Sequence, residues 1–201
     1  MKEQQKGFTL WLTGLPSSGK STLARLVAEE LARRGHAMEV LDGDEVRKHL
    51  SKGLGFSRAD RDENIRRIGF VCRLLSKHGV IAIAAAISPY RAARDEVRSS
   101  IARFFEIHVE ASLETCMQRD IKGLYRKAAE GQLGNLTGVS DPYEPPLNPE
   151  LVVNTESQTP AASASRIIAM LEQTGLVTPS LAPPRSAAEA AIPADWKGFN
   201  N

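Results

Sequence analysis

Short apolar segments alternate along the chain with longer segments in which hydrophobic residues recur at helical spacing. Residues 20–34 and 59–78 show this period, and a glycine follows each segment, as it often does at a helix end. Residues 80–87 are almost all apolar, which is typical of a strand covered on both faces. The alternation predicts an α/β fold with a mainly parallel sheet. The expected strands are residues 8–13, 38–41, 80–87, 104–109 and 151–153, and a closing helix is expected over residues 161–172.

Two regions depart from this rhythm. Residues 119–149 contain four glycines and four prolines, and only residues 122–130 have a helical pattern. An irregular segment of this length inside a compact domain is either disordered or a functional lid. From residue 179 onward the chain is rich in alanine and proline. We therefore expect one domain over residues 1–178 and an extended tail over residues 179–201.

The composition excludes some function classes without selecting one. The net charge of +2 is too small to indicate a nucleic-acid or membrane partner, and no apolar segment approaches the ~18 residues of a membrane span. The N-terminal apolar run is short and leads directly into a glycine-rich loop, so we do not interpret it as a signal peptide. Cys72 and Cys116 lie far apart and form no metal pattern, which favours reduced thiols in the cytoplasm.

The clearest chemical signal follows the first expected strand and opens the first expected helix. Its residues match the phosphate-binding pattern G-x-x-x-x-G-K-[ST] at every fixed position: Gly14, Leu15, Pro16, Ser17, Ser18, Gly19, Lys20 and Ser21. In such a P-loop, backbone N–H groups surround the phosphates, and the helix directs its positive end toward them. Lys20 can reach the β- and γ-phosphates and the Ser21 hydroxyl can ligate Mg²⁺, so the motif predicts binding of ATP and Mg²⁺.

Two acids follow the second expected strand, whereas the apolar third strand ends without one. Asp42 and Asp44 are spaced so that one can position the metal while the other accepts a proton from an attacking hydroxyl. The alternative is a turn in which Asp44 caps a helix over residues 45–49. The guanine-recognition sequence Asn-Lys-x-Asp does not occur, which argues against a GTPase.

A basic cluster comes next in the sequence. Arg66 and Arg67 can form ion pairs along a solvated helix face, whereas Arg47 and Arg61 lie near the starts of elements that face the crevice where α/β sheets bind ligands. Guanidinium groups there suit an anionic acceptor. Phe56, in the loop between them, can stack on a base. Composition alone leaves the binding and solvated readings equally open.

Together these motifs resemble the adenylyl-sulfate kinases, which make 3′-phosphoadenylyl sulfate. The resemblance spans roughly residues 7–177 and rests on segments that occur in the family's order, at residues 14–22, 41–44, 55–67, 87–91, 122–125 and 137–146. It implies a P-loop kinase sheet with helices on both faces, a mobile lid and a homodimer. Many members are fused to an ATP sulfurylase domain, so a separate sulfurylase is an implied supplier of the substrate or an associated partner.

The resemblance also implies roles for individual residues. Thr22 belongs to the nucleotide-binding segment, Arg119 would stack on the ATP adenine, and Lys122 would approach the transferred phosphate. Asp44 would be the base for the acceptor 3′-hydroxyl and Asp42 would lie nearer the metal. The acceptor phosphosulfate, ribose and adenine would contact Arg47, Phe56, Arg61, Asn64, Ile87 and Ser88.

One position departs from the family pattern. The lid usually carries Phe-Thr-Gly, and this chain has Leu136 in place of the phenylalanine that covers the acceptor adenine. Leucine keeps an apolar cover and loses part of the stacking, which is worth roughly 1–3 kcal/mol per base. A different nucleotide-like or sugar acceptor is therefore one alternative, and a non-catalytic nucleotide-binding module is another. Ser88 has been considered a phosphate carrier in the family, but no activating base for it is evident, which favours direct transfer.

Overall fold

The computed structural model describes residues 5–179, which form a five-stranded parallel sheet in the order β2-β3-β1-β4-β5. The strands are β1 (Thr9–Thr13), β2 (Met38–Asp42), β3 (Ile81–Ala85), β4 (Phe104–Glu110) and β5 (Leu151–Asn154). The helices are α1 (Lys20–Arg33), α2 (Gly43–His49), α3 (Arg58–Lys77), α4 (Arg91–Ser100), α5 (Leu113–Arg119), α6 (Leu124–Ala129) and α7 (Pro160–Gln173). The expected α/β class, with five parallel strands, is confirmed.

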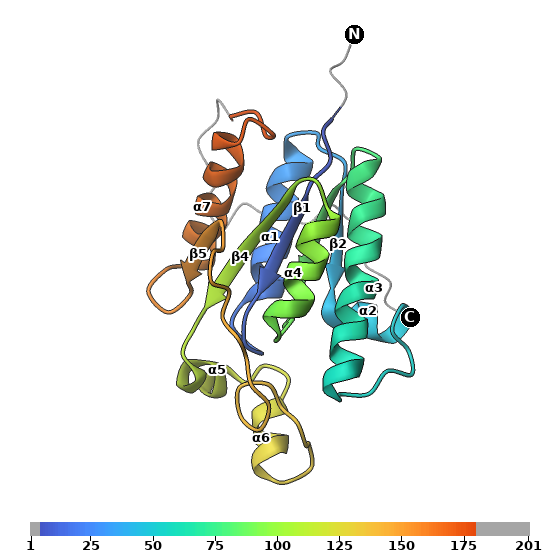
Figure 1. Ribbon diagram of the computed structural model, residues 1–201. Coiled ribbons are helices and arrows are strands. Elements are labelled where there is room, and N and C mark those ends of the chain that lie inside the picture. Colours follow the sequence, from blue (N-terminus) through green and yellow to red (C-terminus); the bar gives the residue numbers. More distant parts are fainter. Residues whose placement is uncertain (1–4, 180–201) are drawn as a thin grey trace.

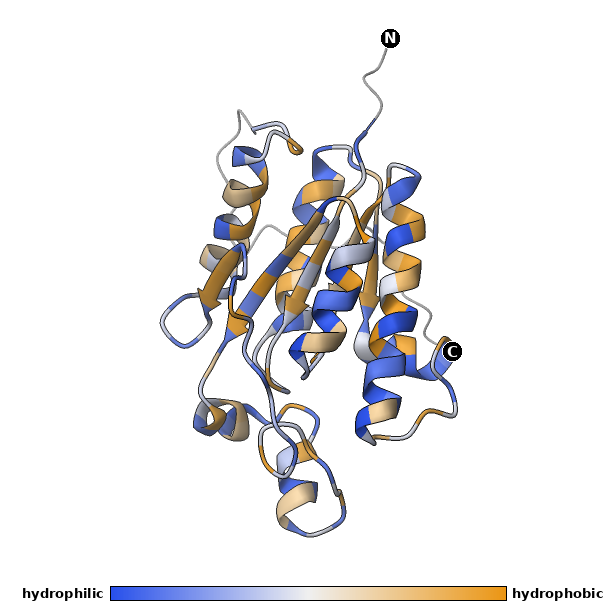
Figure 2. Ribbon diagram, in the orientation of Figure 1, coloured by the Kyte–Doolittle hydropathy of each residue, from blue (hydrophilic) through white to orange (hydrophobic). Residues whose placement is uncertain are grey.

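Successive residues of the central strand face opposite layers, as the two-residue period of a strand requires. Leu10 and Leu12 of β1 belong to a core that includes α1 and α7, whereas Trp11 belongs to a second core that includes α3 and α4. The helices therefore cover both faces of the sheet, as Figure 1 shows. In Figure 2 the strands are largely apolar, while the first turns of α3 near the strand ends are hydrophilic.

Because the strands are parallel, their carboxyl ends lie at one edge of the sheet, where α/β proteins bind ligands. The P-loop follows β1 at this edge, α2 follows β2 directly, and the segment with α5 and α6 lies beyond the same edge (Figure 1). The predicted lid over residues 119–149 therefore lies beyond the carboxyl ends of the strands. There Lys122 of the lid contacts Asp44, although the two residues are far apart in the sequence. The lid's mobility stays a prediction.

Several element boundaries differ from those expected. The sequence pattern did not predict α4 or α5, and it extended the third strand to Ile87, whereas β3 ends at Ala85. The helix after β2 begins at Gly43, and its cap is Asp42, which accepts a hydrogen bond from the Asp44 backbone N–H. The structure therefore does not show the alternative in which Asp44 caps a helix over residues 45–49. Residues 180–201 of the predicted tail lie outside the described residues, and no helix among the described residues is long and apolar enough to cross a membrane.

Candidate active site

The P-loop packs tightly against the strand beside it. A Cβ on Gly14 would lie 2.4 Å from the Val109 carbonyl oxygen of β4, so only glycine fits where the loop leaves β1. Lys20, the first residue of α1, is buried to 8% exposure and donates hydrogen bonds to the Gly14 and Leu15 carbonyl oxygens at 2.9 and 2.6 Å. Burial lowers the pKa of Lys20 to about 7. The lysine thus lies inside the loop, where a bound phosphate would restore its charge.

The two expected metal-binding residues are in direct contact. The Ser21 hydroxyl donates to Asp42 Oδ2 at 2.6 Å, although the two residues come from different βα units. The other Asp42 oxygen accepts from the Asp44 N–H at 3.0 Å, which fixes the carboxylate at the start of α2. A hydroxyl and a carboxylate side by side are hard oxygen ligands of the kind that Mg²⁺ prefers.

The proposed base, Asp44, faces the lid. Its carboxylate forms an ion pair with the Lys122 ammonium, which comes from the turn before α6. Both side chains are about half exposed, at 55% and 51%, so the pair contributes little to stability and can separate readily. The structure therefore brings together the base and the lid cation that the sequence placed far apart.

A basic and aromatic cluster lies beside α2 and the start of α3. The Arg47 guanidinium lies 4.5 Å from the centre of the Phe56 ring, and that of Arg61 lies 5.7 Å from it. The Phe56 side chain is half exposed, which leaves ring surface free for a ligand. Burial, and then the nearby Arg61 charge, lower the pKa of Arg47 below its usual range. Two guanidinium groups held this closely favour an anionic ligand.

Arg61 also contacts the lid. It donates to Thr137 Oγ1 at 2.8 Å and to the Asn135 carbonyl oxygen, and its Nε lies 3.5 Å from Asp141. Asn64, one turn further along α3, is 6% exposed, and its Oδ1 has no hydrogen-bond partner. A buried amide oxygen without a partner is unusual in a native structure and suits a site that receives a ligand.

Ser88 lies just beyond β3 in a left-handed backbone conformation with φ of 42°. Its hydroxyl accepts from Trp11 Nε1 at 3.0 Å and donates to Thr13 Oγ1 at 3.0 Å. Neither neighbour is a base, so the hydroxyl has no group that would activate it as a nucleophile. Ile87, which precedes it, presents its carbonyl oxygen to the Thr13 hydroxyl.

The lid packs on the P-loop through an apolar cluster. Cys116, Tyr125 and Leu136 are buried together against Leu15, and the Tyr125 hydroxyl donates to the Pro16 carbonyl oxygen at 3.1 Å. Leu136 is only 6% exposed within this cluster, so its contact with an acceptor stays a prediction. A cavity of about 450 Å³ lies between Leu15 and residues 138–143.

Arg119 lies at the other side of the P-loop. It donates to the Thr155 hydroxyl and carbonyl oxygens at 2.9 and 2.7 Å, and the Thr155 hydroxyl in turn donates to the Ser18 carbonyl oxygen at 2.9 Å. This places Arg119 near the nucleotide-binding loop, and its stacking on adenine stays a prediction. Thr22 is exposed in the first turn of α1.

Sequence reasoning missed the residues that hold the lid in place. Tyr125 belongs to the family-like segment at residues 122–125, and its hydroxyl is an indication of a polar contact that sequence reasoning did not use. Thr155 follows a short strand and carries no motif. Asp141, which accepts from the Tyr90 hydroxyl and lies near Arg61, looked like one loop acid among several. Their partners are distant in sequence, so only the fold brings them together.

A P-loop at the end of β1, paired acids after β2 and a lid that contacts both define a P-loop phosphotransferase. Its relatives specify the kind. The model of the adenylylsulphate kinase family matches residues 6–154, and the chain belongs to this family.

Curated relatives match almost end to end. The adenylyl-sulfate kinase of Gloeothece citriformis is 53% identical over 172 residues, covering 86% of this chain and 98% of that protein. The adenylyl-sulfate kinase of a Synechococcus strain is 59% identical over 155 residues, covering 77% of this chain and 88% of that protein.

Solved structures agree. The Mycobacterium tuberculosis APS kinase in complex with AMPPNP and APS is 40% identical with a TM-score of 0.80, covering 84% of this chain and 99% of that one. A gluconokinase from Sinorhizobium meliloti, with 18% identity and a TM-score of 0.55, covers 85% of this chain and 94% of that one and shares the fold alone.

Proposed function

We propose that this protein transfers the γ-phosphoryl group of ATP to the 3′-hydroxyl of adenylyl sulfate, giving 3′-phosphoadenylyl sulfate and ADP. The observation that carries the proposal is the contact between Lys122 and Asp44. This pair joins a cation of the lid to a carboxylate of α2. Asp42 at the start of α2 contacts Ser21 of the P-loop, and Arg47 follows Asp44 by one helical turn. A phosphoryl donor and an anionic, aromatic acceptor would meet at this point.

In the proposed reaction, Asp44 accepts the proton of the acceptor hydroxyl as its oxygen bonds to the γ-phosphorus. The bond from that phosphorus to the bridging oxygen of ADP breaks in line with the attack. Lys20 and Lys122 place positive charge around the phosphoryl group, where they stabilise the negative charge on its oxygens in the transition state. Lys122 is released from Asp44 when the acceptor occupies the space between them.

Ser21 and Asp42 are the residues that would hold Mg²⁺. Their oxygens already lie 2.6 Å apart, and the Asp44 N–H orients the carboxylate, so the donor set fits a hard divalent cation. When bound, Mg²⁺ would neutralise phosphate charge during transfer.

The basic and aromatic cluster would recognise the acceptor. Guanidinium forks from Arg47 and Arg61 suit the phosphosulfate, and Phe56 offers a half-exposed ring for the adenine. The unpartnered Oδ1 of Asn64 can accept a hydrogen bond from a ribose hydroxyl. Arg61 would exchange its lid contacts for the acceptor, so acceptor binding would alter how the lid is held.

Direct transfer fits these residues better than transfer through Ser88. The Ser88 hydroxyl is 2% exposed and already forms hydrogen bonds with Trp11 and Thr13. A phosphoserine there would need both bonds to break and a base to appear. Asp44 carries the proton-accepting role without either change.

The wider setting is also part of the proposal. Cys72 and Cys116 are buried free thiols, which suits a reducing cytoplasm. A hexameric APS kinase from Thiobacillus denitrificans and a probable bifunctional SAT/APS kinase from Sorangium cellulosum are relatives over part of their length, since this chain covers 30% and 31% of them. Self-association as a homodimer and contact with a separate ATP sulfurylase are consistent with these relatives.

The deciding assay measures ADP release from Mg-ATP with and without micromolar adenylyl sulfate. We expect turnover that depends on the acceptor and on Mg²⁺. 3′-Deoxyadenylyl sulfate, which lacks the accepting hydroxyl, serves as the matched control and should give no stimulation. ATP binding without stimulation by adenylyl sulfate would instead favour another acceptor, and slow turnover unaffected by any acceptor would favour a regulatory module.

A further inference from the structure

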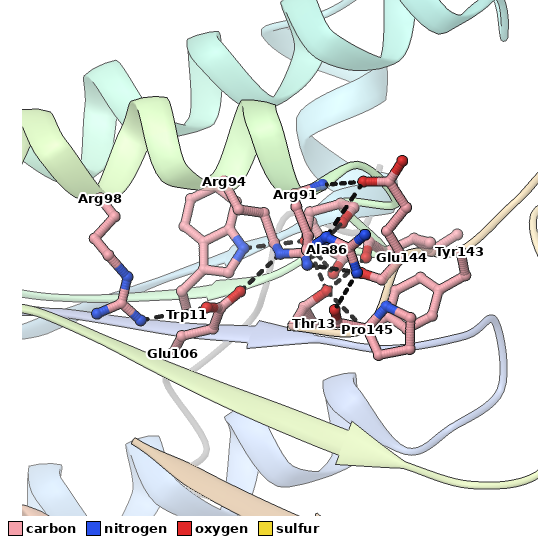
Figure 3. A network of polar contacts seen from close by, with 12 residues as sticks. Trp11, Thr13, Ala86, Arg91, Arg94, Arg98, Glu106, Tyr143, Glu144 and Pro145 are labelled. Carbon is pink, nitrogen blue, oxygen red and sulfur yellow. Dashed lines mark hydrogen bonds and ion pairs between the residues drawn. The ribbon is translucent and has the colours of Figure 1, made fainter. Parts of the chain in front are cut away.

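Arg94 of α4 is the most deeply buried charged side chain among the described residues, at 1% exposure. Its guanidinium donates in three directions: Nε to Glu106 Oε1 at 2.7 Å, one Nη to the Ser88 carbonyl oxygen at 2.5 Å, and the other Nη to the Glu144 carbonyl oxygen at 2.7 Å. Figure 3 shows Arg94 between Glu106 and Glu144, beside Trp11 and Thr13 of β1. One side chain therefore connects β4, the turn after β3 and the final part of the lid.

The Ser88 turn is fixed from both of its sides. Arg94 holds the carbonyl oxygen, while Trp11 and Thr13 hold the hydroxyl. Ser88 has a φ of 42°, which a non-glycine residue adopts only when its surroundings impose it. The three contacts supply that constraint, and among the described residues Arg94 makes the only one directed at the Ser88 backbone.

The final part of the lid, residues 141–149, is anchored in the same place. The Tyr143 hydroxyl lies 3.1 Å from Thr13 Oγ1, and its ring stacks on His108 with centroids 6.0 Å apart. The Arg94 guanidinium lies 6.0 Å from the centre of the Tyr143 ring. The Glu144 N–H donates to the Pro89 carbonyl oxygen at 2.8 Å. We call residues 141–149 the exit arm of the lid.

Stability alone does not account for a buried guanidinium here. Removing two charges from water is costly, and an apolar pair of similar volume often stabilises a core as well or better. What an apolar pair lacks is three donors with fixed directions. Glu106 compensates the Arg94 charge and also accepts from Arg98 at 3.2 Å, so the carboxylate has a second partner. The distinctive property of Arg94 is its simultaneous hold on Ser88 and Glu144.

We propose that Arg94 is a positioning residue for acceptor capture, which fixes the Ser88 turn and the exit arm in one geometry relative to β4. The inference rests on the proposed function and on the acceptor contact at Ser88 that the resemblance implies. Arg94 touches neither substrate, and it acts through the backbone of the two segments that flank the acceptor. It makes no hydrogen bond to the P-loop in the described residues, so nucleotide binding depends on it far less.

The test compares Arg94→Lys with Arg98→Lys. Lysine at position 94 keeps a positive charge near Glu106 but replaces the three-way fork with one ammonium. Arg98 shares Glu106 with Arg94 and reaches neither Ser88 nor Glu144. Its other partner is Glu150, which follows the exit arm, so its variant is the control for loss of a guanidinium at Glu106. We expect Arg94→Lys to raise the KM for adenylyl sulfate about tenfold or more, with the KM for ATP within about twofold. Arg98→Lys should leave both near the wild-type values.

A second readout needs no turnover. Amide hydrogen exchange in residues 141–149 of the protein alone should become faster in Arg94→Lys and stay unchanged in Arg98→Lys. Tyr143→Phe removes the hydroxyl near Thr13 without touching the buried ion pair, and it should also accelerate exchange in the exit arm. This variant keeps the proposal testable if Arg94→Lys does not fold.

The outcomes separate the two proposals. Absence of acceptor-dependent turnover in the wild-type protein refutes the proposed function, and exchange in the exit arm still decides whether Arg94 positions it. Turnover in the wild type, with equal exchange and equal acceptor KM in the two lysine variants, overturns the role of Arg94 alone. Equal rises in both KM values would also overturn it, because they would indicate a general structural defect.

Discussion

The charge of Lys20 gives a prediction that can be worked through in detail. Its ammonium is enclosed by the P-loop, where burial lowers the pKa to about 7 in the protein alone. Phosphate oxygens placed beside it would favour the charged form and return the pKa toward its ordinary range. Binding of Mg-ATP should therefore draw one proton from solution wherever Lys20 is neutral beforehand.

The magnitude follows from the pKa. At pH 8 only about one molecule in ten carries the Lys20 proton, so binding should take up about 0.9 proton. Above pH 7 the affinity for Mg-ATP should then fall by close to tenfold per pH unit, or about 1.4 kcal/mol, until the pKa of the complex is reached. The hydrogen bonds from Lys20 to the Gly14 and Leu15 carbonyl oxygens favour the charged ammonium before ATP binds. The uptake of about 0.9 proton and the tenfold change in affinity per pH unit are therefore upper values.

Isothermal titration calorimetry at pH 8 measures the uptake directly. The observed enthalpy is compared in HEPES and Tris, whose ionisation enthalpies differ, and the slope gives the number of protons bound. Lys20→Arg is the matched control, since arginine stays charged throughout this range and should take up almost none. Uptake below about 0.3 proton in the wild type, or equal uptake in the arginine variant, would refute the reasoning about burial.

Three further predictions concern the base and the lid. Asp44→Asn should lower kcat by about 10²–10⁴-fold while the Kd for ATP stays within about twofold. The control Glu45→Gln makes the same charge change one residue away and should keep kcat near wild type. Equal losses in kcat and in ATP binding would contradict a base role for Asp44. Gly138→Ala should lower the free energy of unfolding, measured in urea, by about 2 kcal/mol, because φ is +89° and the added Cβ would lie 2.7 Å from the side chain of Leu15 in the P-loop. In the control Gly131→Ala, φ is +71° and no atom lies within 4 Å of the added Cβ, so the loss should be about 1 kcal/mol. Leu136→Phe should overpack the lid cluster and lower the free energy of unfolding by about 1–3 kcal/mol in the same urea measurement. A lower acceptor KM is expected if the side chain covers the acceptor adenine, and an unchanged KM would contradict that contact.

The parts of the fold that the sequence predicted are those in which apolar residues carry the pattern. β1, α1 and α3 were expected within a residue or two of their observed bounds, because enough apolar residues recur at the right spacing in each, although α3 also buries Arg61 and Asn64 near its start. α4 was missed because its buried face contains Arg94 beside Ala93 and Val97, so a charge interrupts the period. The period of a helix can be recognised in the sequence only when the residues that it buries are mostly apolar.

The site divides along a similar line. Gly14 to Ser21 are contiguous, so the motif and its chemistry were readable without a fold. A shared metal role was expected for Ser21 from the motif and for Asp42 from the resemblance, and the structure brings the two side chains into contact although β3 lies between β1 and β2. Contacts such as Arg61 with Thr137 join residues separated by 76 positions, and no local pattern encodes them. Hence the identities of the polar groups were predictable, and their partners were not.

The contacts of the lid suggest how one segment serves two ligands. Its first half is held by the nucleotide side, through the bond from Tyr125 to Pro16 of the P-loop. Its second half packs on the P-loop through Leu136 and is also held on the acceptor side, through Arg61 and, at the exit arm, Arg94. Arg61 is also proposed to bind the acceptor, so an arriving anion competes with the lid for the same guanidinium. Closure over both ligands then requires the lid to exchange protein contacts for ligand contacts at its second half, while its first half stays on the P-loop.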